Sequence, residues 1–199
     1  LPIWVLVDVD DTIIEVHGHA KQGAGFGDSG VRGLNALLAT LATASSAPVI
    51  VAQRLRKGST GSPRGAKRLV GDAVRTSRRL LAKSQPVLVR MDSAFYGRGA
   101  VHAVLAGGAA VSVTVRMDNA VKKAIAAISD DAWATIEYTD AVFDEDSGQW
   151  VSRAEVAEVP FTAFTSKAKR LQVSGRLVVR RIPDFAAEGD GLFDVWRFH

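Results

Sequence analysis

The first third of the chain alternates between apolar and polar positions with the period of β-strands. Residues 3–16 combine this alternation with many β-branched side chains, and two further apolar runs follow at residues 34–41 and 47–55. Glycine-rich sequence, which is typical of turns, separates the first run from the second. The pattern predicts three consecutive strands, antiparallel where the connecting turns are tight.

A helix is predicted after these strands. Ser62 and Pro63 are favourable residues for the N-cap and the first helical position. From Ala66 to about Lys83, apolar residues recur at helical spacing. At about 100° per residue, six basic side chains fall within about 120° of one another, opposite the apolar stripe, and this basic face should point outward. The six residues are Arg64, Lys67, Arg68, Arg75, Arg78 and Arg79.

The remaining pattern divides the chain into two parts. A strand over residues 86–91 ends at Asp92, and a helix over 97–107 and a strand over 109–117 follow. These elements complete a first domain, residues 1–116. Beyond it the pattern predicts a β-rich second unit, residues 117–199, with these elements: a short helix at 122–128, a hairpin turning at 146–148, and strands at 175–182 and 192–199.

Composition narrows the class of protein. Of the 199 residues, 47% are hydrophobic and 23% are charged, close to the globular average. The chain has no cysteine, which excludes disulfides, zinc–thiolate sites and cysteine nucleophiles, and favours the cytoplasm. No run reaches the ~18 apolar residues of a membrane span, so no membrane association is expected. Because it lacks an initiator Met and stops within an apolar alternation, we expect a fragment.

Charge is distributed unevenly. Between Gln53 and Arg90 there are eleven lysines and arginines but a single acid, Asp72, whereas the rest of the chain is net acidic. Exposed rows of Lys and Arg bind the phosphates of double-stranded DNA without reading its sequence. A solvated helix face is the alternative, although such faces normally mix both signs of charge.

Carboxylates in an apolar strand need an explanation, because a buried charge is costly unless it is paired or bound to a metal. Asp8, Asp10 and Asp11 lie within the first strand, and the period of two places Asp8 and Asp10 on one face. Asp92 leaves a second apolar strand. Acids converging from neighbouring strands hold cations such as Mg²⁺. The alternative is a strand end that meets solvent, with Asp92 capping the next helix.

Several segments together resemble the DDE transposases of bacterial insertion sequences. The first motif is D-x-T at Asp10, and the second is R-x-D-S-x-F/Y around Asp92. The resemblance covers essentially the whole chain, and the order and separation of its segments make it more specific than either motif alone. The segments are DVDDTIIEVHG, KQGAGFGDSGVRGLNALLA, APVIVAQRLRKGS, VLVRMDSAFYG, EVPFTAF and RLVVRR.

The resemblance implies an α/β fold with a ribonuclease H-like mixed sheet flanked by helices, over residues 1–116, and a β-rich insertion over 117–199. Carboxylates from the first and fourth strands, Asp10 and Asp92, would bind two Mg²⁺ or Mn²⁺ ions, with Asp8 as an assisting ligand. The family's third ligand, a glutamate on a late helix, would come after His199. This fragment is therefore expected to bind metal weakly and not to complete catalysis.

The activity that the resemblance implies is metal-dependent DNA strand cleavage and strand transfer during transposition. In-line attack on a phosphodiester, by water and then by a 3′ hydroxyl, needs acids at fixed positions and no protein nucleophile. The implied partners are the transposon ends and target DNA, bound by a homodimer on paired ends. The implied location is the bacterial cytoplasm, in association with the nucleoid.

Two other functions are kept open. LVDVDDTII also resembles the D-x-D-x-T motif of haloacid-dehalogenase-type phosphatases, in which Asp8 would be the nucleophile and Asp10 the general acid/base. In those enzymes the aspartates end a parallel strand, whereas here the alternation continues past them. The other possibility is an inactive remnant that binds DNA through its basic face.

Weaker signals favour structural interpretations. Gly25-x-Gly27-x-x-Gly30 matches a dinucleotide fingerprint but lacks the acid that would bind the ribose. His17 and His19 have no further ligand at a recognisable metal spacing, so we interpret them as turn-flanking residues. The remaining candidates are also set aside: Asp144 and Asp146 as a calcium loop, Glu155 and Glu158 as late acids, and 165–170 as a phosphate-binding loop.

Overall fold

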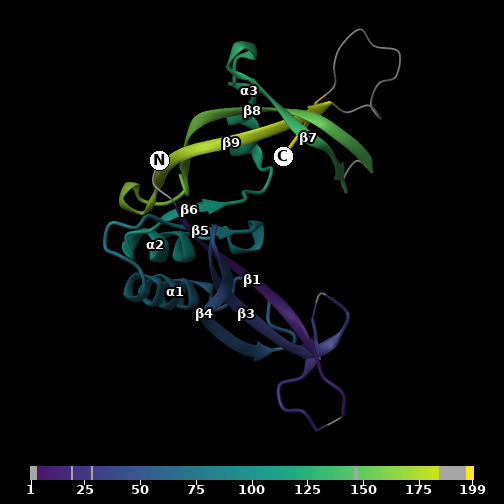
Figure 1. Cartoon of the computed structure of the whole chain (residues 1–199), viewed down its shortest axis with the longest axis vertical. Coiled ribbons are helices and arrows are strands. Elements are labelled where there is room, and N and C mark those ends of the chain that lie inside the picture. Colours follow the sequence, from purple (N-terminus) through teal and green to yellow (C-terminus); the bar gives the residue numbers. More distant parts are fainter. Residues whose placement is uncertain (1–3, 19, 28, 146–147, 184–195) are drawn as a thin grey trace. The chain divides into compact units, whose positions relative to one another are not determined.

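The computed structural model describes residues 4–18, 20–27, 29–145, 148–183 and 196–199. The chain forms two compact units, Leu1–Arg116 and Met117–His199, which we call the first and the second unit (Figure 1). Each unit has its own sheet.

The sheet of the first unit is mixed. Its antiparallel part consists of β1 (Val5–Glu15), β3 (Arg32–Thr43) and β4 (Ser46–Lys57), with the two-residue strand β2 (Gly25–Phe26) also paired to β3. On the other side of β1 lie β5 (Val87–Met91) and β6 (Ala110–Val113), both parallel to their neighbours. The three long antiparallel strands and the strand before Asp92 are confirmed, whereas β2 falls in sequence that predicted only turns.

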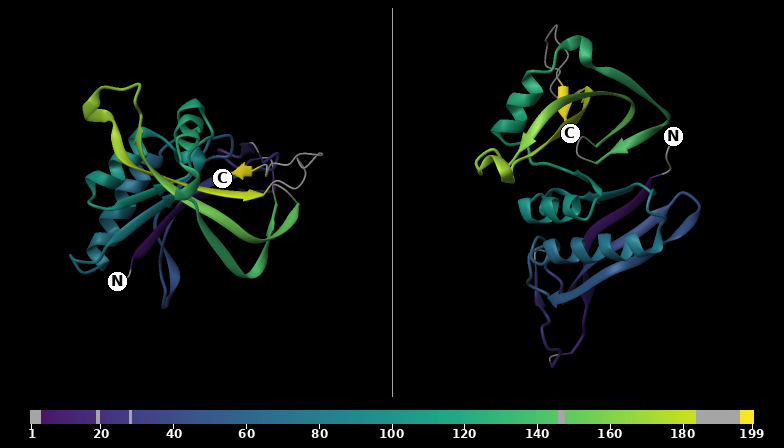
Figure 2. Two further views of the ribbon diagram at one scale, coloured as in Figure 1. Left: turned by 90° about the horizontal axis from the view of Figure 1, so that it is seen from above. Right: turned by 90° about the vertical axis from the view of Figure 1, so that its left-hand side faces the viewer.

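Two helices, α1 (Ala66–Leu80) and α2 (Arg98–Ala106), cover one face of this sheet (Figure 2). Alternate residues of β1 point toward them, so Val5, Val7 and Val9 are buried while Asp8 and Asp10 lie on the opposite face. The core between the sheet and the helices is made of aliphatic side chains, including Leu37, Ala39, Leu69, Val70, Val74, Val87, Val89, Val101 and Val104.

The start of α1 differs from the prediction. Gly65, not Ser62, is the N-cap, and its φ of 86° is a left-handed conformation that glycine adopts at little cost. Ser62 lies in the preceding turns, where the Arg56 guanidinium binds its carbonyl oxygen at 2.9 Å. A side chain from β4 therefore holds this segment as turns. The helix also ends earlier than predicted, because Leu81 is extended.

The second unit contains α3 (Asn119–Ala126) and an antiparallel sheet. Asp118 caps α3 by accepting hydrogen bonds from the Ala120 and Val121 amides, which explains why the helix begins before the predicted Lys122. The sheet has the order β10-β9-β8-β7. Its strands are β7 (Ala134–Asp144), β8 (Gln149–Ala163), β9 (Val173–Pro183) and β10 (Trp196–Phe198).

The predicted β-rich character of residues 117–199 is confirmed by this sheet. β7 and β8 form the expected hairpin, although 146–147, at its turn, lie outside the described residues, as do 192–195 of the last predicted strand. Short 3₁₀ helices also occur at Ser93–Phe95, Asp130–Ala132 and Lys169–Leu171. None of the helices in the described ranges is long and apolar enough to cross a membrane.

Candidate functional site

Asp10 and Asp92 lie at neighbouring positions of β1 and β5. The last paired residues of these parallel strands are Val9 and Met91, and the two aspartates are the next residues along each strand. Val9 and Met91 are buried toward the helices, so strand alternation directs both aspartates to the opposite face, and both are exposed. The parallel pairing thus sets two aspartates that are far apart in the sequence at adjacent backbone positions.

Each of these carboxylates is oriented by a backbone amide. Asp10 Oδ1 accepts a hydrogen bond of 2.7 Å from the Asp11 amide, and Asp92 Oδ1 accepts one of 2.9 Å from the Ala94 amide. The second contact makes Asp92 the N-cap of the 3₁₀ helix Ser93–Phe95, which confirms the capping alternative for that oxygen. Among the described residues, Oδ2 of neither carboxylate accepts a hydrogen bond from the protein, so one oxygen of each remains available to a ligand.

Asp8 is in a different situation from Asp10. Its two oxygens accept hydrogen bonds of 2.6 and 2.8 Å from Arg90, the residue opposite it on β5. This bidentate pair raises the pKa of Arg90, mainly through the hydrogen bond to Asp8. Asp8 already has a protein cation beside it, so it is a poorer candidate ligand than Asp10.

Asp11 belongs to a polar network that sequence reasoning did not find. It points to the helix side of the sheet, where its Oδ2 accepts from Arg56 at 3.0 Å and from Asn35 at 2.5 Å. Arg56 also donates to the Asn35 amide oxygen and to carbonyl oxygens before α1. Burial lowers the pKa of Arg56, and the Asp11 charge opposes this shift. The sequence signal was Asn35, a polar residue within an apolar strand.

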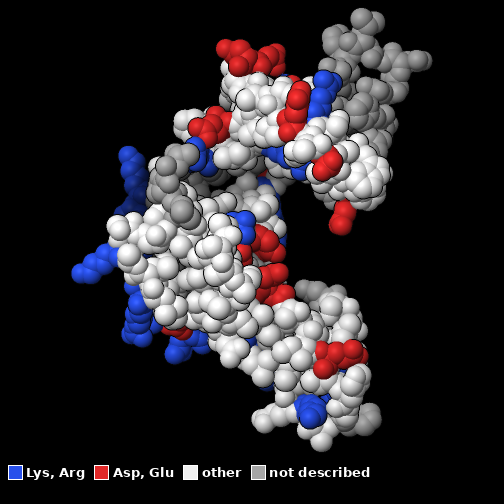
Figure 3. Space-filling view, in the orientation of Figure 1, with Lys and Arg blue, Asp and Glu red and all other residues white. Residues whose placement is uncertain are grey.

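The basic face of α1 is partly as expected. Arg64, Lys67, Arg68, Arg75 and Arg79 are exposed, and blue side chains project from the part of the first unit that holds α1 (Figure 3). Arg78 does not belong to this outward face. It is half-buried and donates to the carbonyl oxygens of Gln85, at 2.8 Å, and Gly108, so it ties α1 to two neighbouring loops.

Asp72 lies at the border of this face and reduces its positive charge. It accepts hydrogen bonds from Arg75 at 2.9 Å and from Arg54 at 2.6 Å. These contacts, that of Arg75 first, lower the pKa of Asp72. Within the described ranges, no ion pair is formed by the other exposed cations of the face, which are Arg64, Lys67, Arg68 and Arg79.

The structure argues against two rival interpretations of the sequence. A dinucleotide fingerprint needs a strand, a tight turn and a helix, but Gly25 lies in β2, which is followed by the strand β3. Of these glycines, Gly27 serves backbone packing, since a Cβ there would lie 2.6 Å from the Gly58 carbonyl oxygen. For the phosphatase motif, β1 continues through Glu15 and pairs antiparallel with β3, so its aspartates do not end the strand.

The other set-aside residues stay apart from the candidate site. His17 is exposed in a loop, whereas His19 lies outside the described residues. Glu155 and Glu158 belong to the second unit, where they pair with Arg181 and Arg176 at 2.6 and 2.7 Å. The segment 165–170 runs through a turn into the 3₁₀ helix Lys169–Leu171.

In comparisons with known proteins, the chain matches no family model and no curated protein. In the part of the chain that the structure describes, no three His, Cys, Asp or Glu side chains cluster as a ready-made metal site. The candidate site therefore consists of the two carboxylates of Asp10 and Asp92, next to the Asp8–Arg90 pair.

Proposed function

We propose that this chain is part of a DDE transposase and that Asp10 and Asp92 are metal ligands for DNA strand cleavage and strand transfer. The observation that carries the proposal is the parallel pairing of β1 with β5, which sets the two aspartates at adjacent positions. Acids from neighbouring strands can hold the divalent cations that assist in-line attack on a phosphodiester.

The topology of the first unit supports the ribonuclease H-like part of this proposal. The resemblance implies that the acids come from the first and fourth strands of such a core. Counting the long strands β1, β3, β4 and β5, Asp10 lies on the first and Asp92 directly follows the fourth. In the chain, α1 precedes the fourth strand, β5, and α2 connects it to β6, after which the β-rich second unit follows. This is the order of elements that the sequence pattern predicts.

The donor set fits a hard divalent cation. Carboxylate oxygens are the ligands that Mg²⁺ and Mn²⁺ prefer, and Asp10 and Asp92 each present one oxygen without a protein hydrogen bond while a backbone amide holds the other. A bound cation would lower the pKa of a water nucleophile and stabilise the leaving oxygen. The aspartates would fix its position, while Arg90 neutralises Asp8 beside them. With two protein ligands, we expect weak affinity.

The exposed cations of α1 support a role in DNA binding. Lys67, Arg68 and Arg79 project into solvent from one side of α1, and Arg64 is exposed in the turn just before the helix. Contacts of this kind position a duplex through its phosphates, independently of its sequence. They weaken at higher salt concentration, because the release of counterions from the DNA then contributes less entropy. We do not include Arg78, because its guanidinium is bound to two backbone carbonyls.

Binding of Mn²⁺, followed by electron paramagnetic resonance of the free ion, tests the metal site. Asp10→Asn and Asp92→Asn should each weaken binding about tenfold, equivalent to ~1.4 kcal/mol. Asp131→Asn is the matched control, because Asp131 is an exposed aspartate of the second unit, and it should change the affinity less than twofold. Equal losses in all three variants, or no loss in any, would contradict the proposal.

A second measurement separates the enzyme from a DNA-binding remnant. Duplex retention at low salt should fall when Arg68 and Arg79 are both changed to Glu, and remain when Lys123, on α3, is changed to Glu. Retention without strand cleavage in Mn²⁺ would favour the interpretation as an inactive DNA-binding remnant. Release of phosphate from a monoester, lost in Asp8→Asn, would instead support the phosphatase.

A further inference from the structure

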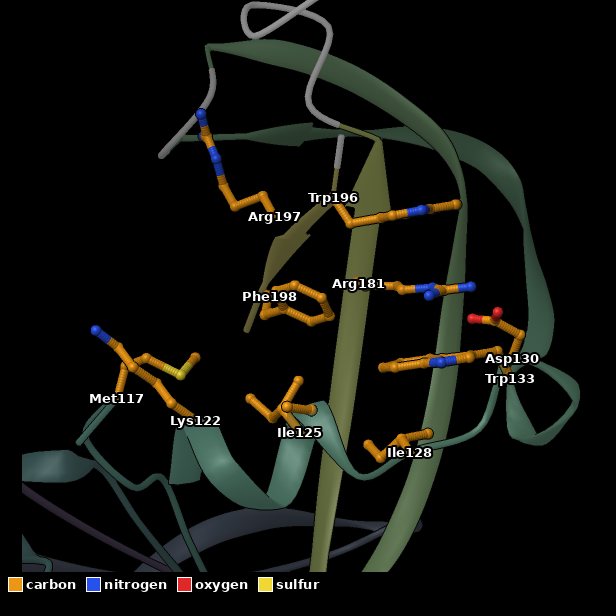
Figure 4. Close-up of a pocket in the computed structure, with 11 residues that line it drawn as sticks. Met117, Lys122, Ile125, Ile128, Asp130, Trp133, Arg181, Trp196, Arg197 and Phe198 are labelled. Atoms are coloured by element: carbon orange, nitrogen blue, oxygen red, sulfur yellow. The ribbon is translucent and has the colours of Figure 1, made fainter. Parts of the chain in front are cut away.

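The second unit contains a cavity of about 580 Å³ that the proposed function does not use. It is formed by α3, by the segment that follows it, and by β9 and β10 (Figure 4). Its volume is within the range of small-molecule sites, which is about 300–1,000 Å³. All the residues that line it belong to the second unit.

One wall of the cavity is a stack of three planar groups. The Arg181 guanidinium lies between the rings of Trp133 and Trp196, at 4.1 and 4.2 Å from their centroids. It also donates a hydrogen bond of 2.6 Å to Glu155. Cation–π contacts on both sides and the ion pair hold Arg181 in place and balance its charge. The wall is therefore rigid, aromatic and nearly neutral.

The rest of the lining is largely apolar, and its charged residues are unevenly distributed. Phe198 packs against Trp133 with centroids 6.1 Å apart, and Ile125 and Ile128 lie below them. Two basic residues, Lys122 and Arg197, line the side of the cavity away from the acid Asp130, which sits beside Trp133. One end of an apolar cavity thus carries a positive charge.

We propose that this cavity binds a small molecule that has an apolar ring system and one anionic group. The ring system would pack against Phe198 and the aromatic wall, where apolar area is removed from water. The anionic group would lie near Lys122. This inference is independent of the metal site, because it uses no residue of the first unit.

A matched pair of fluorescent probes tests both parts of the proposal in the full chain. Anilinonaphthalene sulfonate carries a ring system and an anion, whereas phenylnaphthylamine has the same ring system without the charge. The sulfonate should bind at one saturable site per chain and bind more tightly than the neutral probe. Energy transfer from tryptophan, two of which line the cavity, should accompany binding.

Three variants assign the binding to the cavity. Lys122→Glu should weaken sulfonate binding about tenfold and leave the neutral probe within twofold. Lys123→Glu is the control, because Lys123 is the next residue on α3, is equally exposed and does not line the cavity. Ala126→Trp should abolish binding of both probes, since Ala126 is an exposed lining residue and a large side chain there fills the space.

Each alternative outcome overturns the proposal. Equal weakening by Lys122→Glu and Lys123→Glu would show general charge attraction. Unchanged binding in Ala126→Trp would place the probe elsewhere on the surface, and equal affinity for both probes would remove the anionic requirement. Far-UV circular dichroism and urea midpoints verify that each variant is folded; if Ala126→Trp is not, Ala126→Leu is the second space-filling variant.

Discussion

Each unit holds a partly buried arginine against a carboxylate, and the two pairs are held in different ways. In the first unit, Arg56 and Asp11 are surrounded by hydrogen-bonding partners, namely Asn35 and the carbonyl oxygens before α1. In the second unit, the contact between Arg181 and Glu155 is shorter, 2.6 Å against 3.0 Å, and the guanidinium lies between two indole rings. An arginine–carboxylate pair is thus stabilised by polar groups in one unit and by aromatic faces in the other.

The difference indicates what each arginine contributes. Arg56 connects β1, β3 and β4 to the turns before α1, so its removal takes a donor from the buried Asn35 amide oxygen and from the partly buried Asp11 carboxylate. Arg181 fills a gap between two flat apolar surfaces, which another long side chain can also fill. The side chains of Arg56 and Asp11 are 9% and 13% exposed, and those of Arg181 and Glu155 are 13% and 25% exposed. Solvent can therefore replace the lost partner more easily in the second unit.

The largest effect is expected for Arg56→Met. It should lower the free energy of unfolding by about 3 kcal/mol, because it leaves the Asp11 carboxylate buried without its cation. Urea unfolding followed by far-UV circular dichroism measures this loss. Arg64→Met, an exposed arginine nearby, is the control and should cost less than about 0.5 kcal/mol. Similar losses of unfolding free energy in both variants would show that the network around Arg56 contributes no more to stability than an exposed charge does.

A smaller loss, about 1 kcal/mol, is expected for Arg181→Met. The methionine side chain is long and flexible enough to stay between Trp133 and Trp196, while the half-buried Glu155 gains water. Tryptophan fluorescence is the suitable probe of urea unfolding, because three of the four tryptophans lie in the second unit. The control is Arg176→Met, which removes an exposed pair with Glu158. A loss as large as that of Arg56→Met would abolish the distinction between the two pairs.

The smallest effect is expected at Asp72, whose pairs with Arg75 and Arg54 are more exposed. These hydrogen bonds lower its pKa in the folded chain, so they contribute stability above its unfolded pKa of about 4. That contribution disappears as the pH falls through the lower folded pKa. Asp72→Asn should therefore cost less than about 1 kcal/mol at neutral pH, and the difference from the unaltered chain should vanish in acid. A difference that grows on acidification would contradict the assignment.

Regular elements were predictable where a single period dominated the sequence. The alternation of β1 located Asp8 and Asp10 on one face, and the apolar stripe from Ala66 identified α1. The predictions were wrong where a side chain forms hydrogen bonds with residues outside its own helix or strand. Arg78 shares the angular range of its exposed neighbours but binds two loop carbonyls, and Ser62 is a good N-cap that Arg56 holds outside the helix.

The candidate site was predictable in its residue types and only partly in its electrostatics. Asp10 and Asp92 could be identified because an acid within or directly after an apolar strand is unusual. The pairing of Asp8 with Arg90 depends on the register between β1 and β5, which no local pattern contains. The stack around Arg181 likewise unites Trp133 and Trp196, which are distant in sequence.

The ion pair between Asp8 and Arg90 joins residues 82 positions apart. A chain that has formed only the β1–β3–β4 meander and α1 lacks this pair, because β5 must still dock beside β1. Closing so long a loop is slow relative to hairpin formation. We therefore expect Asp10 and Asp92 to reach adjacent positions at a late stage of folding, when β5 docks beside β1, and a partly folded chain would carry these acids without that geometry.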